Sequence, residues 1–115
     1  MRAINFTLSE SYASLLRQSA GCTIRYGNKA AQYKAGQVID ITFGDMYMKK
    51  RKVYTAYIDQ VLVKPISLLT ARDLQGENQQ LNTSEDFLAW YCDAFKKTIN
   101  QSDFVTVIYF SEIVA

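Results

Sequence analysis

The chain has 115 residues, of which 49% are hydrophobic and one is proline, and its formal net charge is +2. This length and composition predict a single globular domain over residues 1–115 and argue against wholesale disorder. No apolar run approaches the roughly 20 residues that a membrane-spanning helix needs, and the first residues lack the apolar core of a signal peptide. We therefore expect a cytoplasmic protein with no membrane partner.

The histidine and cysteine content restricts the chemistry that the chain can perform. It contains no histidine, and its two cysteines, Cys22 and Cys92, have neither the number nor the spacing of a disulfide framework or a metal site. Histidine is the commonest zinc ligand and the usual base at neutral pH. We therefore expect no metal and no cofactor, and any catalysis has to use Thr, Ser, Tyr, Lys or carboxylate side chains.

The first part of the chain predicts a strand, a helix and a second strand. Residues 2–6 read as a short strand, and Thr7 and Glu10 fit a capping box at the start of a helix. Apolar residues at 8, 12, 15 and 16 follow the helical repeat, and Gly21 is suited to end the helix. The next strand covers residues 22–26 and ends at Gly27.

The middle of the chain predicts an antiparallel hairpin formed by residues 38–43 and 53–63, ended by Pro65. Its tip carries four consecutive cations, Lys49, Lys50, Arg51 and Lys52. Like charges at a hairpin tip repel one another, so stability does not explain them. Phosphate attraction is one explanation, and protection of a sheet edge by solubilising charges is the other.

The last part predicts two helices and a closing strand. Thr70 is placed to cap a short helix over residues 71–74, residues 76–80 form a polar loop, and a second helix runs from Thr83 to about residue 100. The second helix is expected to bury four residues: Phe87, Tyr91, Ala94 and Phe95. We interpret Trp90 as partly buried packing rather than a platform for base stacking. Residues 104–113 are apolar on both faces, as in a strand that is covered on both sides.

This order of elements indicates an α+β fold, a small curled or closed β-barrel with helices outside. Within it, the strand Thr23-Ile24-Arg25 is distinctive because alternation places the Thr23 hydroxyl and the Arg25 guanidinium on the same face. Arginine suits phosphate or carboxylate groups. The alternative is an exposed strand face with a surface arginine.

Three segments carry a family resemblance: Thr23-Ile24-Arg25, the turn Lys34-Ala35-Gly36 and the segment Gly76-Glu77-Asn78. With the order of elements around them, they make the chain resemble the ASCH family of the PUA-like superfamily, a group of RNA-associated β-barrels. The resemblance implies a small PUA-like curled β-barrel with flanking helices. It also implies a cleft between the barrel and the first helix that binds nucleic acid or a nucleoside.

The smallest enzymes of that family hydrolyse the amide of N4-acetylcytidine, and the resemblance implies Thr23 as the nucleophile and Glu77 as the acid/base. The activating lysine of the family precedes the threonine by three residues, and that position is Ala20 here. A threonine hydroxyl is a weak nucleophile without a base, and such assistance is worth about 10²–10⁴-fold. Unless Lys29 or Lys34 substitutes, we expect binding without turnover.

The leading hypothesis is therefore a module that binds RNA or a modified nucleoside. Its predicted pocket residues are Thr23, Arg25, Tyr26, Glu77 and Asn78, with added phosphate attraction from Lys49, Lys50, Arg51 and Lys52. Glu77 can instead be a solvated loop carboxylate and Asn78 a turn former, while Tyr26, Tyr33 and Tyr47 can be stacking or packing residues. The amidohydrolase is the alternative function, and a protein-interaction module is a third.

Overall fold

The computed structural model describes residues 2–8, 15, 20–45, 47 and 49–114. Within them lie five strands, two α-helices and one turn of 3-10 helix. The strands are β1 (Ala3–Phe6), β2 (Ala20–Tyr26), β3 (Val38–Phe43), β4 (Arg51–Pro65) and β5 (Phe104–Glu112). The helices are η1 (Ile66–Leu68), α2 (Ala71–Glu77) and α3 (Ser84–Phe95).

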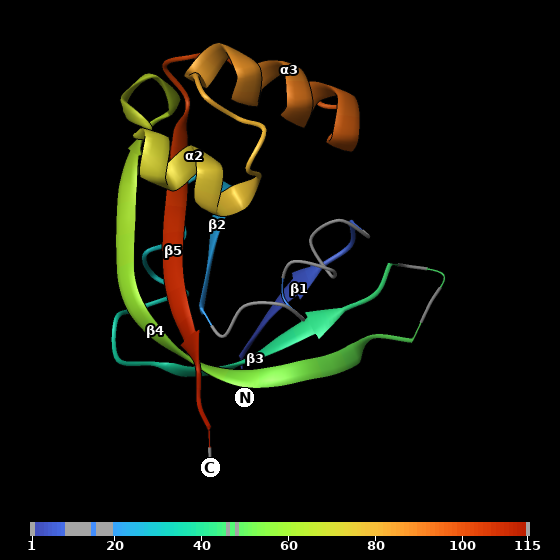
Figure 1. The fold of residues 1–115 in the computed structure, drawn as a ribbon. Helices are drawn as coiled ribbons and strands as arrows, with labels where there is room; N and C mark the ends of the chain where they lie inside the picture. Colours follow the sequence, from blue (N-terminus) through green and yellow to red (C-terminus); the bar gives the residue numbers. More distant parts are fainter. Residues whose placement is uncertain (1, 9–14, 16–19, 46, 48, 115) are drawn as a thin grey trace.

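The five strands form one curled sheet in the order β1-β3-β4-β5-β2, in which β1 is parallel to β3 and the other neighbours are antiparallel. The long strand β4 bends through the sheet (Figure 1). Its pairing shifts by one residue at Val53, opposite β3, and at Asp59, opposite β5. Such bulges bend a strand and increase its twist, so the sheet curls into a half-barrel whose edges are β1 and β2. This confirms the predicted α+β class.

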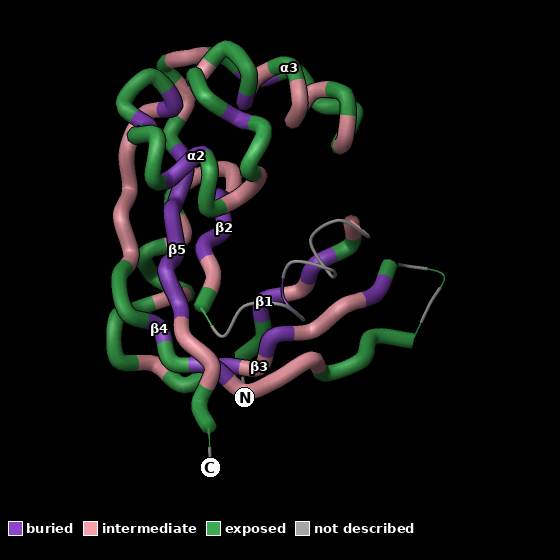
Figure 2. The backbone as a smooth tube through the Cα atoms, viewed as in Figure 1, coloured by how far each residue is buried: buried purple, intermediate pink, exposed green. Residues whose placement is uncertain are grey.

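Strand β5 separates two hydrophobic cores, which explains why both of its faces are apolar. Val105, Val107 and Tyr109 belong to the core that also holds residues of α2 and α3. Ile108 and Phe110 belong to a second core, formed with residues of β1, β3 and β4. Figure 2 shows the buried stretch along β5. The prediction that this strand is covered on both sides is confirmed, although its first residue, Phe104, is 52% exposed.

Both helices after β4 differ from the predicted boundaries. Thr70 caps α2 as predicted, but Gly76 and Glu77 form the last turn of this helix rather than a polar loop. Helix α3 begins after Thr83 as predicted and ends at Phe95 instead of about residue 100, because Lys96 takes a left-handed conformation with φ 53°. Phe95, predicted to be buried, is 43% exposed. No helix among the described residues is long and apolar enough to cross a membrane.

The predicted first helix lies mostly outside the described residues. Of its predicted apolar residues the structure describes Leu8, which is not helical, and Leu15, which is helical and buried. The predicted end of this helix at Gly21 is wrong, because β2 already begins at Ala20. Gly21 serves packing instead of capping. A Cβ atom there would lie 2.5 Å from Cζ of Phe110, so only glycine lets the ring pack directly on the strand.

The predicted hairpin of β3 and β4 is confirmed, but the cations are not all at its tip. Arg51 and Lys52 belong to β4, where they pair with Phe43 and Thr42. Lys49 and Lys50 lie in the connection between the strands. The pairing of β4 with β3 skips Val53 at the bulge and continues with Lys52 and Arg51.

Candidate functional site: a cleft between the two sheet edges

A cleft of about 300 Å³ lies where the two edges of the half-barrel face each other. The described residues that line it are 5–8, at β1 and just after it, 23–26 of β2, Glu77 at the end of α2, and Trp90, Tyr91 and Phe95 of α3. Strand edges and a helix end supply polar groups, while α3 supplies rings. The cleft therefore combines a polar side with an aromatic wall.

Three of the predicted residues meet in this cleft. Arg25 Nε donates to Thr23 Oγ1 at 3.2 Å, and Thr23 Oγ1 donates to Glu77 Oε1 at 3.2 Å. The shared face of Thr23 and Arg25, predicted from strand alternation, is thereby confirmed. No Arg25–Glu77 ion pair within 4.0 Å is formed, because the threonine hydroxyl connects the two charged groups. Thr23 itself is 1% exposed.

Glu77 also completes the edge of β2. The same Oε1 atom accepts the backbone N–H of Ile24 at 3.1 Å. Strand β2 is an edge strand, so outward N–H groups such as this one have no ladder partner. One carboxylate oxygen thus holds both the strand edge and the threonine. Among the described residues, nothing donates to the other oxygen, Oε2.

Glycine at position 76 explains how Glu77 comes this close to β2. A Cβ atom on Gly76 would lie 2.6 Å from Cβ and 3.0 Å from Sγ of Cys22. Real Cβ atoms do not approach other carbons that closely, so only glycine lets the last turn of α2 rest on the strand. The sequence Gly76-Glu77 therefore has a physical reason: the first residue removes the side chain that would hold the second away.

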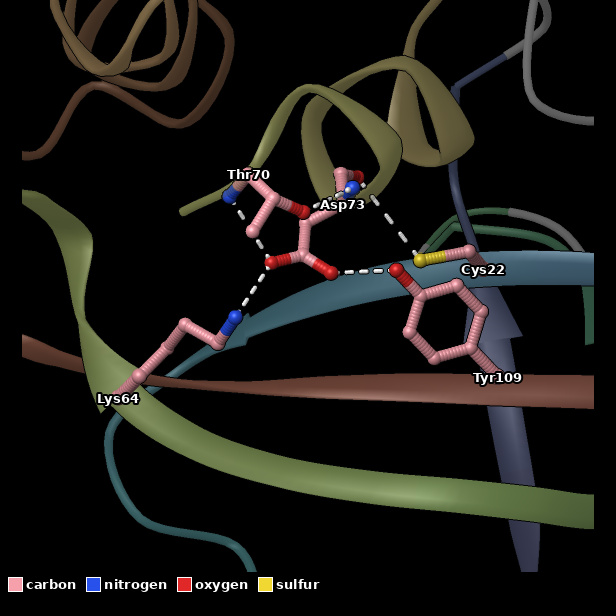
Figure 3. Close-up of polar contacts among 5 residues, drawn as sticks. All are labelled: Cys22, Lys64, Thr70, Asp73 and Tyr109. Atoms are coloured by element: carbon pink, nitrogen blue, oxygen red, sulfur yellow. Dashed lines mark hydrogen bonds and ion pairs between the residues drawn. The ribbon is translucent and has the colours of Figure 1, made fainter. Parts of the chain in front are cut away.

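A buried polar network anchors the start of α2 (Figure 3). Asp73, 2% exposed, accepts from Lys64 Nζ at 2.7 Å, from the N–H of Thr70 at 3.1 Å and from the hydroxyl of Tyr109. Burial opposes the charge on this carboxylate, but the three hydrogen bonds outweigh burial, and the pKa of Asp73 lies below its usual value. The network ties α2 to β4 and β5 at one end, while Gly76 and Glu77 tie it to β2 at the other.

Burial acts on both charged groups of the cleft. It raises the pKa of Glu77, although the N–H of Ile24, the charge of Arg25 and the hydroxyl of Thr23 act in the opposite direction. It lowers the pKa of Arg25, whose guanidinium stays protonated in any case. The guanidinium carbon lies 4.9 Å from the ring centre of Phe6, a cation–π contact that joins the two edges of the sheet across the cleft.

The aromatic wall is a connected set of rings. Tyr91 lies 4.7 Å from Phe95 and 6.3 Å from Tyr26, and Trp90 lies 5.9 Å from Phe95, measured between ring centres. The hydroxyl of Tyr26 donates to Asp103 at 3.0 Å, and Lys97 Nζ lies 4.3 Å from the centre of the Tyr26 ring. Tyr26 therefore lines the cleft as predicted, held by its own contacts.

Other predicted residues lie elsewhere. Asn78 does not line the cleft, and its side chain accepts the N–H of Gln80, which is the turn-forming role. All eight lysines of the chain are among the described residues, and none lines the cleft or bonds Thr23. This applies to Lys29 and Lys34, which lie in the connection between β2 and β3. A lysine base for Thr23, the alternative kept open for these two residues, is therefore not formed.

Sequence reasoning missed the β1 side and the aromatic side of the cleft. Asn5 and Phe6 gave no signal, because the strand pairing that brings β1 opposite β2 is not local. Trp90 is partly buried and packs against the first core, as predicted, and it also lines the cleft. The helical repeat of α3 gave no signal for the cleft, because the same apolar stripe sends Phe87 into the core and leaves Phe95 43% exposed. No group of residues suited to a metal ion is found in the described part of the chain.

The fold and the cleft define the class: an open, curled α+β half-barrel whose site lies between its edge strands. The chain has the fold of an ASCH domain. A crystal structure of an ASCH domain from Lactobacillus crispatus JV V101 superposes with a TM-score of 0.62 over 96% of this chain and 78% of that one, at 12% sequence identity. A scan against models of protein families and a search of curated proteins found no match.

Proposed function

We propose that the cleft binds a nucleobase, as part of RNA or of a modified nucleoside. The observation that carries this proposal is the combination of an aromatic wall with the side chains of Arg25 and Glu77, joined through Thr23, in one cleft. A base is flat, so it can stack on rings, and its edge carries donors and acceptors that match a guanidinium and a carboxylate. The ASCH fold is consistent with this class of ligand.

The polar groups of the cleft are arranged for recognition. Glu77 Oε1 accepts from Thr23 and from the backbone of Ile24, whereas Oε2 has no donor within the described part of the chain and can accept an N–H of a base. Arg25 donates from Nε to Thr23. Its two terminal nitrogens have no acceptor within the described part of the chain and can donate to a base. Because both side chains are fixed by these contacts, little side-chain entropy is lost when a base binds.

The same geometry disfavours hydrolysis of N4-acetylcytidine. Thr23 is almost fully buried and bonded on both sides. Among the residues that the structure describes, the only group placed to accept its proton is Glu77, which also holds the strand edge. A carboxylate is a poor base for a hydroxyl compared with a tuned amine. We expect binding without turnover.

The only tryptophan of the chain lines the cleft, so its fluorescence reports binding directly. Cytidine, N4-acetylcytidine and an eight-nucleotide oligocytidylate are titrated separately. Hydrogen bonds to charged groups contribute about 1.5–3 kcal/mol, so Arg25→Ala is expected to weaken binding by roughly 10- to 100-fold. The control is Arg2→Ala, which removes an exposed arginine that lies on the ring of Tyr33, outside the cleft.

Fluorescence that does not change with any of these ligands contradicts the proposal, as does equal weakening by Arg25→Ala and Arg2→Ala. The wild type is also assayed for release of acetate from N4-acetylcytidine. If acetate is released and this activity is lost in both Thr23→Ala and Glu77→Ala, the protein is an amidohydrolase and the binding proposal is wrong. Glu77→Gln keeps the acceptor oxygen for the strand edge and removes the charge. It is expected to weaken binding while the protein stays folded.

A further inference from the structure

The end of the β3–β4 hairpin carries cations that the cleft does not use. We propose that the ligand is a single strand of RNA, which places one base in the cleft and its neighbouring phosphates on Lys49, Lys50 and Arg51, called here the basic hairpin end. This inference rests on the proposed function, because it extends the same ligand beyond the cleft. A free nucleoside, having no phosphate, would use the cleft alone.

Strand register places the basic hairpin end beside the cleft. Phe6, which lines the cleft, pairs with Phe43, and Phe43 pairs with Arg51. Neighbouring strands are about 4.8 Å apart, so the backbones of Phe6 and Arg51 are about 10 Å apart across the sheet. The hairpin end and α3, which forms the aromatic wall, project toward the same side of the molecule (Figure 1). A short strand of RNA can therefore touch both.

The cleft strand also fixes where the hairpin turns. Asn5 Nδ2 donates to the carbonyl of Gly44 at 2.8 Å, and the N–H of Gly44 donates to the carbonyl of Phe6 at 3.0 Å. A Cβ atom on Gly44 would lie 2.9 Å from Cα of Lys50, so the backbone of the lysine packs directly on the glycine. The connection is thus bonded to a cleft-lining strand at the point where the cations begin.

The cations of the basic hairpin end are exposed to solvent. Lys49, Lys50 and Arg51 are exposed, and within the described part of the chain none of them forms an ion pair. The neighbouring Lys52 differs, because its Nζ lies 3.6 Å from Asp40. Tyr47, 89% exposed, lies in the same connection and offers a ring on which a second base can stack. Exposed cations next to an exposed ring are typical of single-strand binding.

The test compares two double variants that remove the same charge. Lys49→Ala/Lys50→Ala changes the basic hairpin end, and Lys29→Ala/Lys34→Ala changes the β2–β3 connection, which lies on the other side of the view in Figure 1. Binding of the eight-nucleotide oligocytidylate and of cytidine is measured at 50 and 200 mM salt. Each phosphate contact on a single strand contributes about −0.7 to the slope of log K against log salt.

Loss of two contacts is expected to reduce the slope by about 1.4, so over a fourfold rise in salt the wild type should lose roughly sevenfold more affinity than Lys49→Ala/Lys50→Ala. The Lys29→Ala/Lys34→Ala variant should behave as wild type, and cytidine binding should be the same in all three proteins.

Equal slopes in the two variants overturn the inference, as does tighter binding to phosphatidylserine vesicles than to RNA. If cytidine binds but the oligonucleotide binds no better, the inference fails while the proposed function stands. If only the oligonucleotide binds, independently of Arg25, the proposed function fails instead.

Discussion

Replacement of Gly76 by alanine tests the contact that brings Glu77 to β2. The added Cβ atom would lie 2.6 Å from Cβ of Cys22, whereas carbon atoms in contact are about 3.5 Å apart or more. Because β2 is buried between β5 and α2, we expect the end of α2 to retreat by about 1 Å. The bonds from Glu77 to Ile24 and Thr23, at 3.1 and 3.2 Å, then become too long to count as hydrogen bonds.

The expected cost follows from these changes. Overpacking costs about 1–3 kcal/mol and the two lost hydrogen bonds about 1 kcal/mol each, against a helix-propensity gain of about 1 kcal/mol for alanine over glycine. A net loss of about 3 kcal/mol in the free energy of unfolding should lower Tm by about 9–15 °C in a chain of this size. Ligand affinity should fall as well, because the carboxylate is displaced.

Two comparisons make the experiment specific. Gly27→Ala places a Cβ atom where no atom lies within 4 Å, but at φ 86°, so it should cost about 1 kcal/mol in backbone strain and leave ligand binding unchanged. Cys22→Gly removes the atoms that clash, and in combination with Gly76→Ala it should show a coupling of about 1 kcal/mol or more. Unfolding by urea and Trp90 fluorescence titration are the measurements. A Gly76→Ala protein with unchanged Tm and affinity would refute the reasoning.

Three further outcomes are expected. Asp73→Asn should destabilise the fold above pH 5, because Lys64 loses its charged partner. Folding lowers the pKa of Asp73, so the stability that its carboxylate contributes is lost as the pH falls below about 4. The free energies of unfolding of the two proteins in urea should therefore become equal at low pH. Lys96→Gly should raise the free energy of unfolding by about 1 kcal/mol, because glycine adopts φ 53° without strain, and an unchanged urea midpoint would contradict this. Cys22 is buried with its pKa raised to about 12, so a thiol reagent at pH 8 should react with Cys92 first, and a Cys92→Ser protein should react only on unfolding.

Local patterns were sufficient to predict the strands and the shared face of Thr23 and Arg25. Alternation along a strand is a property of neighbouring residues, so it survives whatever packs around it. The extension of α2 over Gly76 and Glu77 was not predictable, because glycine and the following polar residues favour a loop. Packing on Cys22, which is 54 residues away from Gly76 in sequence, decides the helix there.

The aromatic wall illustrates a second limit. A helical repeat shows that α3 has an apolar face, but it does not show whether this face meets a core or an open cleft. Phe87 enters the core, whereas Phe95, on the same helix, is 43% exposed at the cleft. Which of the two occurs depends on the curl of the sheet, and this in turn depends on two bulges in β4 that leave no clear mark in the sequence.

The pairing of β2 with β5 has a consequence for the order of folding. Thr23 pairs with Ile108, so β2 must wait for 85 further residues before its ladder can form. Such distant pairing slows folding, because a long loop has to close first. During synthesis on the ribosome, β4 and β2 each lack a neighbour until β5 emerges, and both present unpaired edges in that interval. The cleft, which takes four of its lining residues from β2, is therefore assembled only after β5 has joined the sheet.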